Sequence, residues 1–426
     1  NAAAKFFAEG RSFDVCLAFA VCIPAMYYTI TRSLDVEISF SQLYGILIFL
    51  FLLSIITCRR KTIRLKLSVV LFYAYLLLAI VFTIMFVDGN HFDTVSIAYI
   101  FLPLAICVMP LDSRYVLESI SVTSIIIFPF FLFGYVDGSF SSSQEMQPIG
   151  YALLPLAFSG FGLAHGEVHP IVKTASLIVS IATILILAVS GTRGPLVSIL
   201  IYIGYISIAK RDLDFNVQVK FEVLTLIIIA ALIVIISFEP LVKLLAIVLP
   251  SLGIDSDALN KTIRLLNENN LDNGRNYLYS AAINDFYRSP IFGNGLATFT
   301  YMNYTYPHNL FLQLLCEGGL VLAIPVVCWL LRGLYHVFSK CDWHDYSLFG
   351  LLFAASVPNL MFSSSIWLTG SLWILLAWIS CHLFTQDNQV ALRSGNERLF
   401  SIQRPGQIDR SKEEARSSSK RIGLME

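Results

Sequence analysis

Four side chains of this 426-residue sequence combine reactive chemistry with an unusual setting: Arg193, Arg275, His308 and Glu317. Arginine binds phosphate through a planar fork of N–H donors. A neutral histidine can take a proton from a hydroxyl group, and an acid within an apolar segment is a functional candidate. Anion binding and proton transfer are therefore the chemistries that these residue types indicate.

Each arginine also has a structural alternative. Arg193 lies in the tight link 190–195, where small residues leave its guanidinium and nearby backbone N–H groups open to an anion. The alternative is an arginine that snorkels at a membrane edge. Arg275 follows Gly274 and begins a predicted helix, so it would add a guanidinium to free helix N–H donors. Its alternative is a solvated surface charge.

His308 follows Tyr306-Pro307, where the chain enters an apolar segment, and Asn309 is suited to cap the helix that begins there. The imidazole is either a base facing a cavity at the membrane surface or part of a structural helix start. Glu317 lies nine residues further, about 13 Å along a helix and roughly on its opposite face. We expect Glu317 to accept hydrogen bonds between helices rather than to pair with His308, although an intramembrane acid remains a functional candidate.

Three other motifs are weaker. In the sequence 165–169 two histidines stand four apart, but the glutamate is one place off the zinc pattern H-E-x-x-H. The turn Gly293-Asn294-Gly295 lacks the strand and the third glycine of a dinucleotide site. Asp255 and Asp257 are equally explained by a divalent cation or by a helix cap. We therefore predict no metal site and no cofactor.

The elements that must position these residues are those of a membrane protein. Hydrophobic residues form 56% of the chain and charged residues 14%, with a mean hydropathy of +0.72. A soluble protein carries about 25% charged residues, so a chain this apolar would expose large apolar patches in water. The net charge of zero argues against a nucleic-acid binder, which is usually basic.

Twelve runs approach the roughly 20 apolar residues that a helix needs to cross a bilayer. Their cores are residues 13–30, 41–57, 67–87, 94–110, 119–135, 150–164, 174–189, 195–209, 223–238, 310–331, 347–362 and 367–384. The run at 150–164 is the shortest. The predicted fold class is an all-α polytopic membrane protein with about 12 transmembrane helices.

The distribution of Lys and Arg predicts the orientation, because short cytoplasmic loops carry an excess of both. With the N-terminus inside, twelve of these residues fall in the inner loops and only Arg32 and Arg193 in the short outer loops. Both termini are therefore predicted to be cytoplasmic. The transmembrane domain spans 1–384, with 239–308 as one long, helical external loop between spans nine and ten. Residues 385–426 are polar and predict a disordered cytoplasmic tail.

The region from Gly274 to Leu320 resembles the signature of the bacterial O-antigen ligase and O-antigen polymerase superfamily. The similar segments are Gly274-Arg275, Ser289-Pro290-Ile291-Phe292-Gly293-Asn294-Gly295, Pro307-His308-Asn309-Leu310-Phe311-Leu312-Gln313 and Glu317-Gly318-Gly319-Leu320. The turn Thr192-Arg193-Gly194 resembles the other arginine motif of the family. These motifs cover about a fifth of the chain, and the topology described above agrees with that of the family.

This resemblance implies an inverting, metal-independent glycosyltransferase of the bacterial inner membrane with its active site on the periplasmic side. The donor would be a glycan linked to undecaprenyl pyrophosphate, and the acceptor a sugar hydroxyl on another glycan or on lipid A-core. Arg193 and Arg275 would neutralise the departing pyrophosphate, His308 would deprotonate or orient the hydroxyl, and Asn309 would contact substrate. Glu317 would support the site. Membrane lipids and polysaccharide-assembly proteins are the implied partners.

Ligases of this family show His-Asn, nine residues, Gly, two residues and then Gly, Thr or Tyr. Here His308-Asn309 is followed by Gly319, but the last position is Leu322, which favours a polymerase over a ligase. A multispan transporter or lipid flippase is the alternative from another class. The absence of an internal repeat and the scarcity of ionisable residues within the spans argue against it.

Overall fold

The long apolar runs in the described part of the chain form helices. The structure, a computed structural model, describes residues 11–58, 66–86, 94–140, 143–163, 168–190, 192–211, 217–219, 275–339 and 341–383, with a few single positions between 220 and 274. Residues up to His382 belong to one compact unit. The predicted span at 223–238, the loop residues 239–274 and the predicted tail 385–426 lie outside the described ranges, apart from those few single positions.

The elements in chain order are α2 (Ser12–Ser33), α3 (Phe40–Thr57), α4 (Leu67–Phe86), α5 (Thr94–Cys107), α6 (Ser113–Val136), α7 (Ser143–Ala152), α8 (Leu154–Gly162), α9 (Pro170–Val189), α10 (Arg193–Ile208), β1 (Ala209–Arg211), β2 (Val217–Val219), α14 (Arg275–Arg288), α15 (Thr298–Asn303), α16 (Leu310–Ser339), α17 (Trp343–Phe362), α18 (Gly370–Trp378) and a π-helical end (Ile379–Leu383).

Six of the described helices are long and apolar enough to cross a membrane: α2, α3, α4, α6, α9 and α16. Shorter apolar helices coincide with α5, α10 and α18. On α3 and α4 large apolar side chains point away from the protein, and Phe49 and Leu78 are 66% and 69% exposed. Such surfaces suit hydrocarbon rather than water. The chain is therefore a multi-pass α-helical membrane protein.

Two local features differ from the predicted all-α pattern. The run expected to form one span at 150–164 is divided between α7 and α8, and Pro155 occupies the first turn of α8, where its missing N–H group costs nothing. In addition, β1 and β2 pair antiparallel over three residues each, directly after α10. Neither feature alters the helical architecture.

Close helix contacts depend on small residues. Gly134 on α6 faces Ser33 on α2, where a Cβ would collide with the serine side chain. On α8, Gly160 lies against the backbone of Leu177 on α9, and its N–H donates to Ser180 Oγ at 2.9 Å. Glycine and serine allow helix backbones to approach closely in membranes, so these pairs bring α2, α6, α8 and α9 together.

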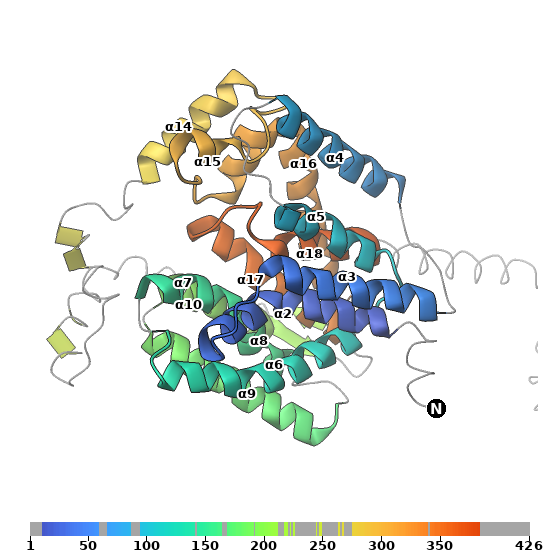
Figure 1. Ribbon diagram of the computed structural model, residues 1–426, viewed down its shortest axis with the longest axis vertical. Helices are drawn as coiled ribbons and strands as arrows, with labels where there is room; N and C mark the ends of the chain where they lie inside the picture. The colour runs from blue at the N-terminus through green and yellow to red at the C-terminus, as the bar shows by residue number, and fades with distance from the viewer. Residues whose placement is uncertain are drawn as a thin grey trace, which may run out of the picture. The chain divides into compact units, whose positions relative to one another are not determined.

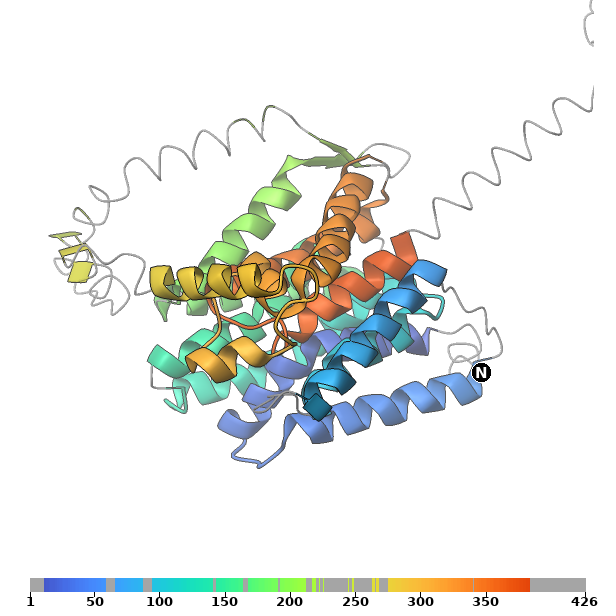
Figure 2. The ribbon, with the colours of Figure 1, turned by 90° about the horizontal axis from the view of Figure 1, so that it is seen from above.

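The last helices lie among the others. α17 packs against α6, α8, α10, α16 and α18, and α18 also contacts α5 and α2. Figure 1 shows α17 and α18, in orange to red, between α14 on one side and α2 and α3 on the other, and Figure 2 shows the same helices from above. The C-terminal end of α17 is therefore reached by side chains from several distant parts of the sequence.

Candidate active site

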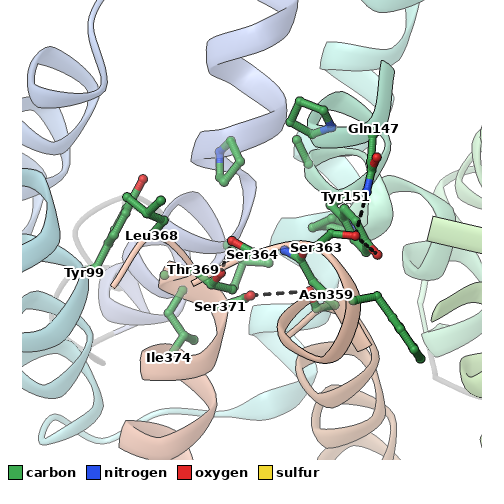
Figure 3. Close-up of a pocket in the computed structure, with 18 of the residues that line it drawn as sticks. Tyr99, Gln147, Tyr151, Asn359, Ser363, Ser364, Leu368, Thr369, Ser371 and Ile374 are labelled. Carbon is green, nitrogen blue, oxygen red and sulfur yellow. Dashed lines mark hydrogen bonds between the residues drawn. The ribbon is translucent and has the colours of Figure 1, made fainter. Parts of the chain in front are cut away.

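A cavity of about 620 Å³ opens beside the C-terminal end of α17. This volume lies within the range of small-molecule binding sites. Arg275 at the start of α14 and His308 in the link between α15 and α16 both line the cavity. In Figure 3, Gln147 and Tyr151 lie at one end of the cavity and Tyr99 lies at the other. The structure thus brings two of the predicted site residues to one cavity.

The last residues of α17 bind side chains from other elements. Arg275 Nη2 donates to the carbonyl oxygen of Phe362 at 2.9 Å, and the Tyr306 hydroxyl donates to the carbonyl oxygen of Ser363 at 2.6 Å. The last carbonyls of a helix have no partner within the helix. Arg275 and Tyr306 supply such partners, and these bonds hold both side chains at the edge of the cavity.

His308 occupies the left-handed region of backbone space, with φ of 54°, which is uncommon for a residue other than glycine. Its ring lies 4.4 Å from the ring of Tyr306, centroid to centroid. Burial and the Arg275 charge lower the pKa of His308 below its ordinary value of 6.5, although a hydrogen bond with the backbone of Phe362 acts in the opposite direction. Its Nδ1 is buried and has no hydrogen-bond partner in the described part of the chain. The neutral imidazole is therefore the favoured form near pH 7, and one of its ring nitrogens lacks a hydrogen-bond partner in the described part of the chain.

Asn309 caps α16. Its side-chain oxygen accepts hydrogen bonds from the N–H groups of Phe311 at 3.0 Å and Leu312 at 3.2 Å. This is the helix-start role that the sequence suggested. The carboxamide oxygen is engaged, so a substrate contact from Asn309 would have to come from its amide nitrogen.

Arg193 is the first residue of α10. Its side chain lies outside the described part of the structure, but the backbone around it is placed near the cavity. A Cβ on Gly194 would collide with the hydroxyl of Tyr151, which lines the cavity, and a Cβ on Gly150 would lie 2.7 Å from Pro195 Cγ. The N-terminus of α10 therefore packs directly on α7, next to the end of the cavity that holds Tyr151.

Glu317 is fully buried on α16 and is surrounded by donors. One carboxylate oxygen accepts from the N–H of Phe299 at 3.2 Å, and the other accepts from the indole of Trp367 and from Gln313 Nε2 at 3.3 Å. These partners belong to α15, to the link between α17 and α18, and to α16 itself. Glu317 does not line the cavity, so the structure favours the interhelical role that we expected from its spacing to His308.

α16 is broken at Gly319, where φ is 59° and ψ is −163°. The segment 289–295 fills the break with backbone hydrogen bonds from Asn294 N to Cys316 O (3.0 Å), Gly295 N to Glu317 O (3.1 Å), Leu320 N to Pro290 O (2.9 Å) and Val321 N to Ile291 O (3.1 Å). A Cβ on Gly319 would collide with the Ile291 carbonyl. The glycines of the segment 289–295 and of the break in α16 therefore allow these two stretches of backbone to approach each other closely.

The cavity has a positive electrostatic character. Arg275 is the one Lys or Arg in the described lining, and no Asp or Glu contributes to that lining. Within the described ranges no group of three or more His, Cys, Asp and Glu side chains is suited to a metal ion. Asp255 and Asp257 fall outside those ranges, while His169 accepts a hydrogen bond from Ile171 N at the start of α9.

Sequence reasoning did not select Gln147, Tyr151 and Ser363. Gln147 and Tyr151 belong to α7, which overlaps only the start of the shortest predicted span, 150–164. Ser363 begins a run of three serines between two apolar helices. A polar Gln and Tyr four residues apart beside a proline are a signal that their helix lines a polar space. Tyr306 stood within the His308 motif, but its bond to Ser363 joins residues 57 apart and has no local signature.

Comparison with known protein families gives a match over part of the chain. Residues 178–327 match the family described as O-antigen ligase. This stretch includes Arg193, Arg275, His308 and the break in α16, so the resemblance identified from the sequence motifs is confirmed there. Curated proteins and solved structures give no match to the chain.

Proposed function

We propose that this protein is a glycosyltransferase of the O-antigen ligase and polymerase superfamily that moves a glycan from undecaprenyl pyrophosphate to an acceptor sugar hydroxyl. The observation that carries the proposal is the pairing of Arg275 and His308 on one cavity, inside the stretch that matches the O-antigen ligase family. A fixed positive charge and a neutral imidazole with a free nitrogen are the two groups that such a transfer needs.

In the proposed reaction, His308 accepts the proton of the acceptor hydroxyl while that oxygen attacks the anomeric carbon of the donor sugar. The bond from this carbon to the pyrophosphate oxygen breaks, and the electron pair leaves with the pyrophosphate. Attack opposite the leaving group inverts the anomeric centre. Negative charge grows on the leaving group, and Arg275 together with Arg193 would stabilise it in place of a metal ion.

The rest of the cavity supports a glycan as ligand. Away from Arg275 it is lined by the rings of Tyr28, Phe40, Tyr44 and Tyr99 and by the hydroxyl-bearing residues Ser364, Thr369 and Ser371. Tyr44 and Tyr99 pack edge to face at 5.2 Å, centroid to centroid. A lining that combines aromatic rings with hydroxyl groups suits a sugar, which has apolar C–H faces and a polar rim, better than it suits a purely apolar chain.

We further propose the complete topology of twelve spans, with the loop 239–308 in the periplasm and both termini in the cytoplasm. The placement of the link at Gly194 and of His308 around one cavity supports this arrangement, because the charge distribution assigns both to the same side of the membrane.

Cysteine labelling should test the sidedness. Single cysteines at Tyr277, which is 73% exposed on α14, and in the 385–426 tail would be introduced after replacement of the native cysteines. A membrane-impermeant maleimide added to spheroplasts should label the α14 position and leave the tail unlabelled until the membrane is opened. Labelling of the tail in intact spheroplasts, with protection of α14, would show that the proposed orientation is wrong and that the site is not periplasmic.

Deletion of the gene should test the function. We expect lipid-linked glycan to accumulate on the outer face of the inner membrane, while the long or ligated polysaccharide disappears. Restoration by the wild-type protein is the control. Accumulation on the cytoplasmic face instead would indicate that the protein transports lipid-linked glycan across the membrane.

Between the two transferases we propose the polymerase, on the basis of Leu322. This residue is fully buried, and it packs over the break in α16, where a Cβ on Gly318 would collide with it. The ligase remains the second candidate because the matched family is described as O-antigen ligase. In the deletion strain, single repeat units still joined to lipid A-core would indicate a polymerase, whereas full-length polymer left on its lipid carrier would indicate a ligase.

A further inference from the structure

The hydroxyl of Tyr151 lies between the start of α10, which carries Arg193, and the end of α17, where the Phe362 carbonyl binds Arg275. Tyr151 is 7% exposed on α7, and its hydroxyl oxygen lies 3.1 Å from Ser363 Oγ. On another side it occupies the space that a Cβ on Gly194 would need. It therefore contacts both the end of α17 and the start of α10 (Figure 3 shows the contact with Ser363).

The contact with α17 is held by more than one bond. Gln147 Nε2, one turn earlier on α7, also donates to Ser363 Oγ, at 2.6 Å. Ser363 directly follows Phe362, whose carbonyl binds Arg275. A displacement of the Ser363 side chain would therefore be passed to the backbone that holds Arg275.

The contact with α10 is equally close. The residue before Gly194 is Arg193, the first residue of the helix. Gly150 and Pro195 interlock beside the Tyr151 contact, so α7 and α10 meet over two consecutive positions of each helix. A change in the size of the Tyr151 side chain would therefore alter the distance between the start of α10 and the end of α17.

We propose that Tyr151 is a positioning residue. It sets the distance between the start of α10, which carries Arg193, and the end of α17, where the Phe362 carbonyl holds Arg275. The inference rests on the proposed function, in which both arginines act on one pyrophosphate. Because charge on that group grows as the glycosidic bond breaks, the spacing of the two arginines matters more in the transition state than in the bound ground state. Misplacement of reacting groups by about 1 Å can lower a rate by about 100-fold.

Tyr151→Phe removes the hydroxyl and keeps the ring. We expect kcat to fall about tenfold, with the apparent KM for the donor changed less than about twofold. Ser363→Ala removes the other half of the same contact and should have a similar effect. The double variant should be no slower than the slower single variant, because groups that act as one unit are not additive. The assay uses purified protein in phospholipid vesicles and lipid-linked glycan extracted from cells that lack this protein.

Tyr202→Phe is the matched control. Tyr202 is a fully buried tyrosine on α10 whose hydroxyl donates to the Phe158 carbonyl at 3.4 Å, and it does not line the cavity. Its loss should leave kcat within about twofold. The positioning role would be overturned if kcat of Tyr202→Phe fell as much as that of Tyr151→Phe. It would also be overturned if the effects of Tyr151→Phe and Ser363→Ala multiplied in the double variant, or if Tyr151→Phe raised KM and left kcat unchanged.

Arg275→Ala in the same assay separates this inference from the proposed function. If Arg275→Ala is inactive and Tyr151→Phe is fully active, the positioning role is wrong and the proposed function stands. If Arg275→Ala is fully active, the role of Arg275 is wrong and the positioning inference is overturned with it, whereas absence of transfer by the wild-type protein would overturn the proposed function itself.

Discussion

Replacement of Arg275 by alanine is expected to lower the rate of glycan transfer by at least about 100-fold. Loss of one donor to a developing negative charge typically costs a factor of 10² to 10³. Arg275 is the one Lys or Arg in the described lining of the cavity, so no neighbouring cation in that lining can replace it. The measurement is initial transfer rate with purified protein, after membrane insertion and thermal stability have been shown to match the wild type.

Arg275→Lys should also be poor, for a reason that the structure provides. One nitrogen of the guanidinium is already bound to the Phe362 carbonyl, so Arg275 is held in place by one N–H group while the others remain for an anion. A lysine ammonium is a single point charge without this fork. Near-normal activity of the lysine variant would show that charge alone suffices and that the anchored geometry is unimportant.

Arg288→Ala is the control on the same helix. Its side chain is 75% exposed at the end of α14 and forms a 3.4 Å ion pair with Asp285, and it does not line the cavity. Exposed ion pairs contribute at most about 1 kcal/mol. We expect activity within twofold of the wild type, and a loss equal to that of Arg275→Ala would mean that α14 as a whole, rather than Arg275, had been disturbed.

Much of the helical architecture could be predicted because an apolar run of about 20 residues has few alternatives to a helix in hydrocarbon. The expected cores 41–57 and 67–87 lie within one residue of α3 and α4. α6 begins at Ser113, six residues before its expected core, because the half-buried pair Arg114–Glu118 (2.9 Å) lies within the helix. Apolar patterning alone cannot detect a polar first turn of this kind.

The break in α16 and the assembly of the cavity could not be predicted in the same way. Gly318 and Gly319 belong to one of the similar motifs, but the break depends on the segment 289–295, which supplies its hydrogen bonds from about 25 residues away. Arg275 and Phe362 are separated by 87 residues. The types of the proposed catalytic residues could be read from the sequence, whereas the carbonyls and hydroxyls that place them arise only from long-range packing.

The pH dependence of transfer should report His308. As a base it must be neutral, so the rate should fall when pH drops through its pKa. Burial, and then Arg275, lower that pKa below 6.5, so the acidic limb of the profile should have its midpoint below pH 6.5 rather than at it. His308→Ala should lose about 10² to 10⁴-fold in kcat. His308→Gln, which cannot titrate, should lose the acidic limb as well.

His344 provides the control for a histidine that is distant from the cavity. It is half-buried near the start of α17 and lies 18 residues before Phe362, about 27 Å away along the helix. His344→Gln should leave both the rate and the acidic limb unchanged. If instead its profile changes and that of His308→Gln does not, the base has been assigned to the wrong histidine.

The two active-site predictions are coupled through the charge of Arg275. Because that charge disfavours the imidazolium form of His308, its removal should raise the His308 pKa. The residual activity of Arg275→Ala should therefore show an acidic limb at higher pH than the wild type, whereas Arg275→Lys, which keeps the charge, should show little shift. A structural arginine remote from the reacting group would lower the rate without moving this midpoint. An unchanged midpoint in Arg275→Ala would mean that the two side chains do not share one electrostatic environment during turnover.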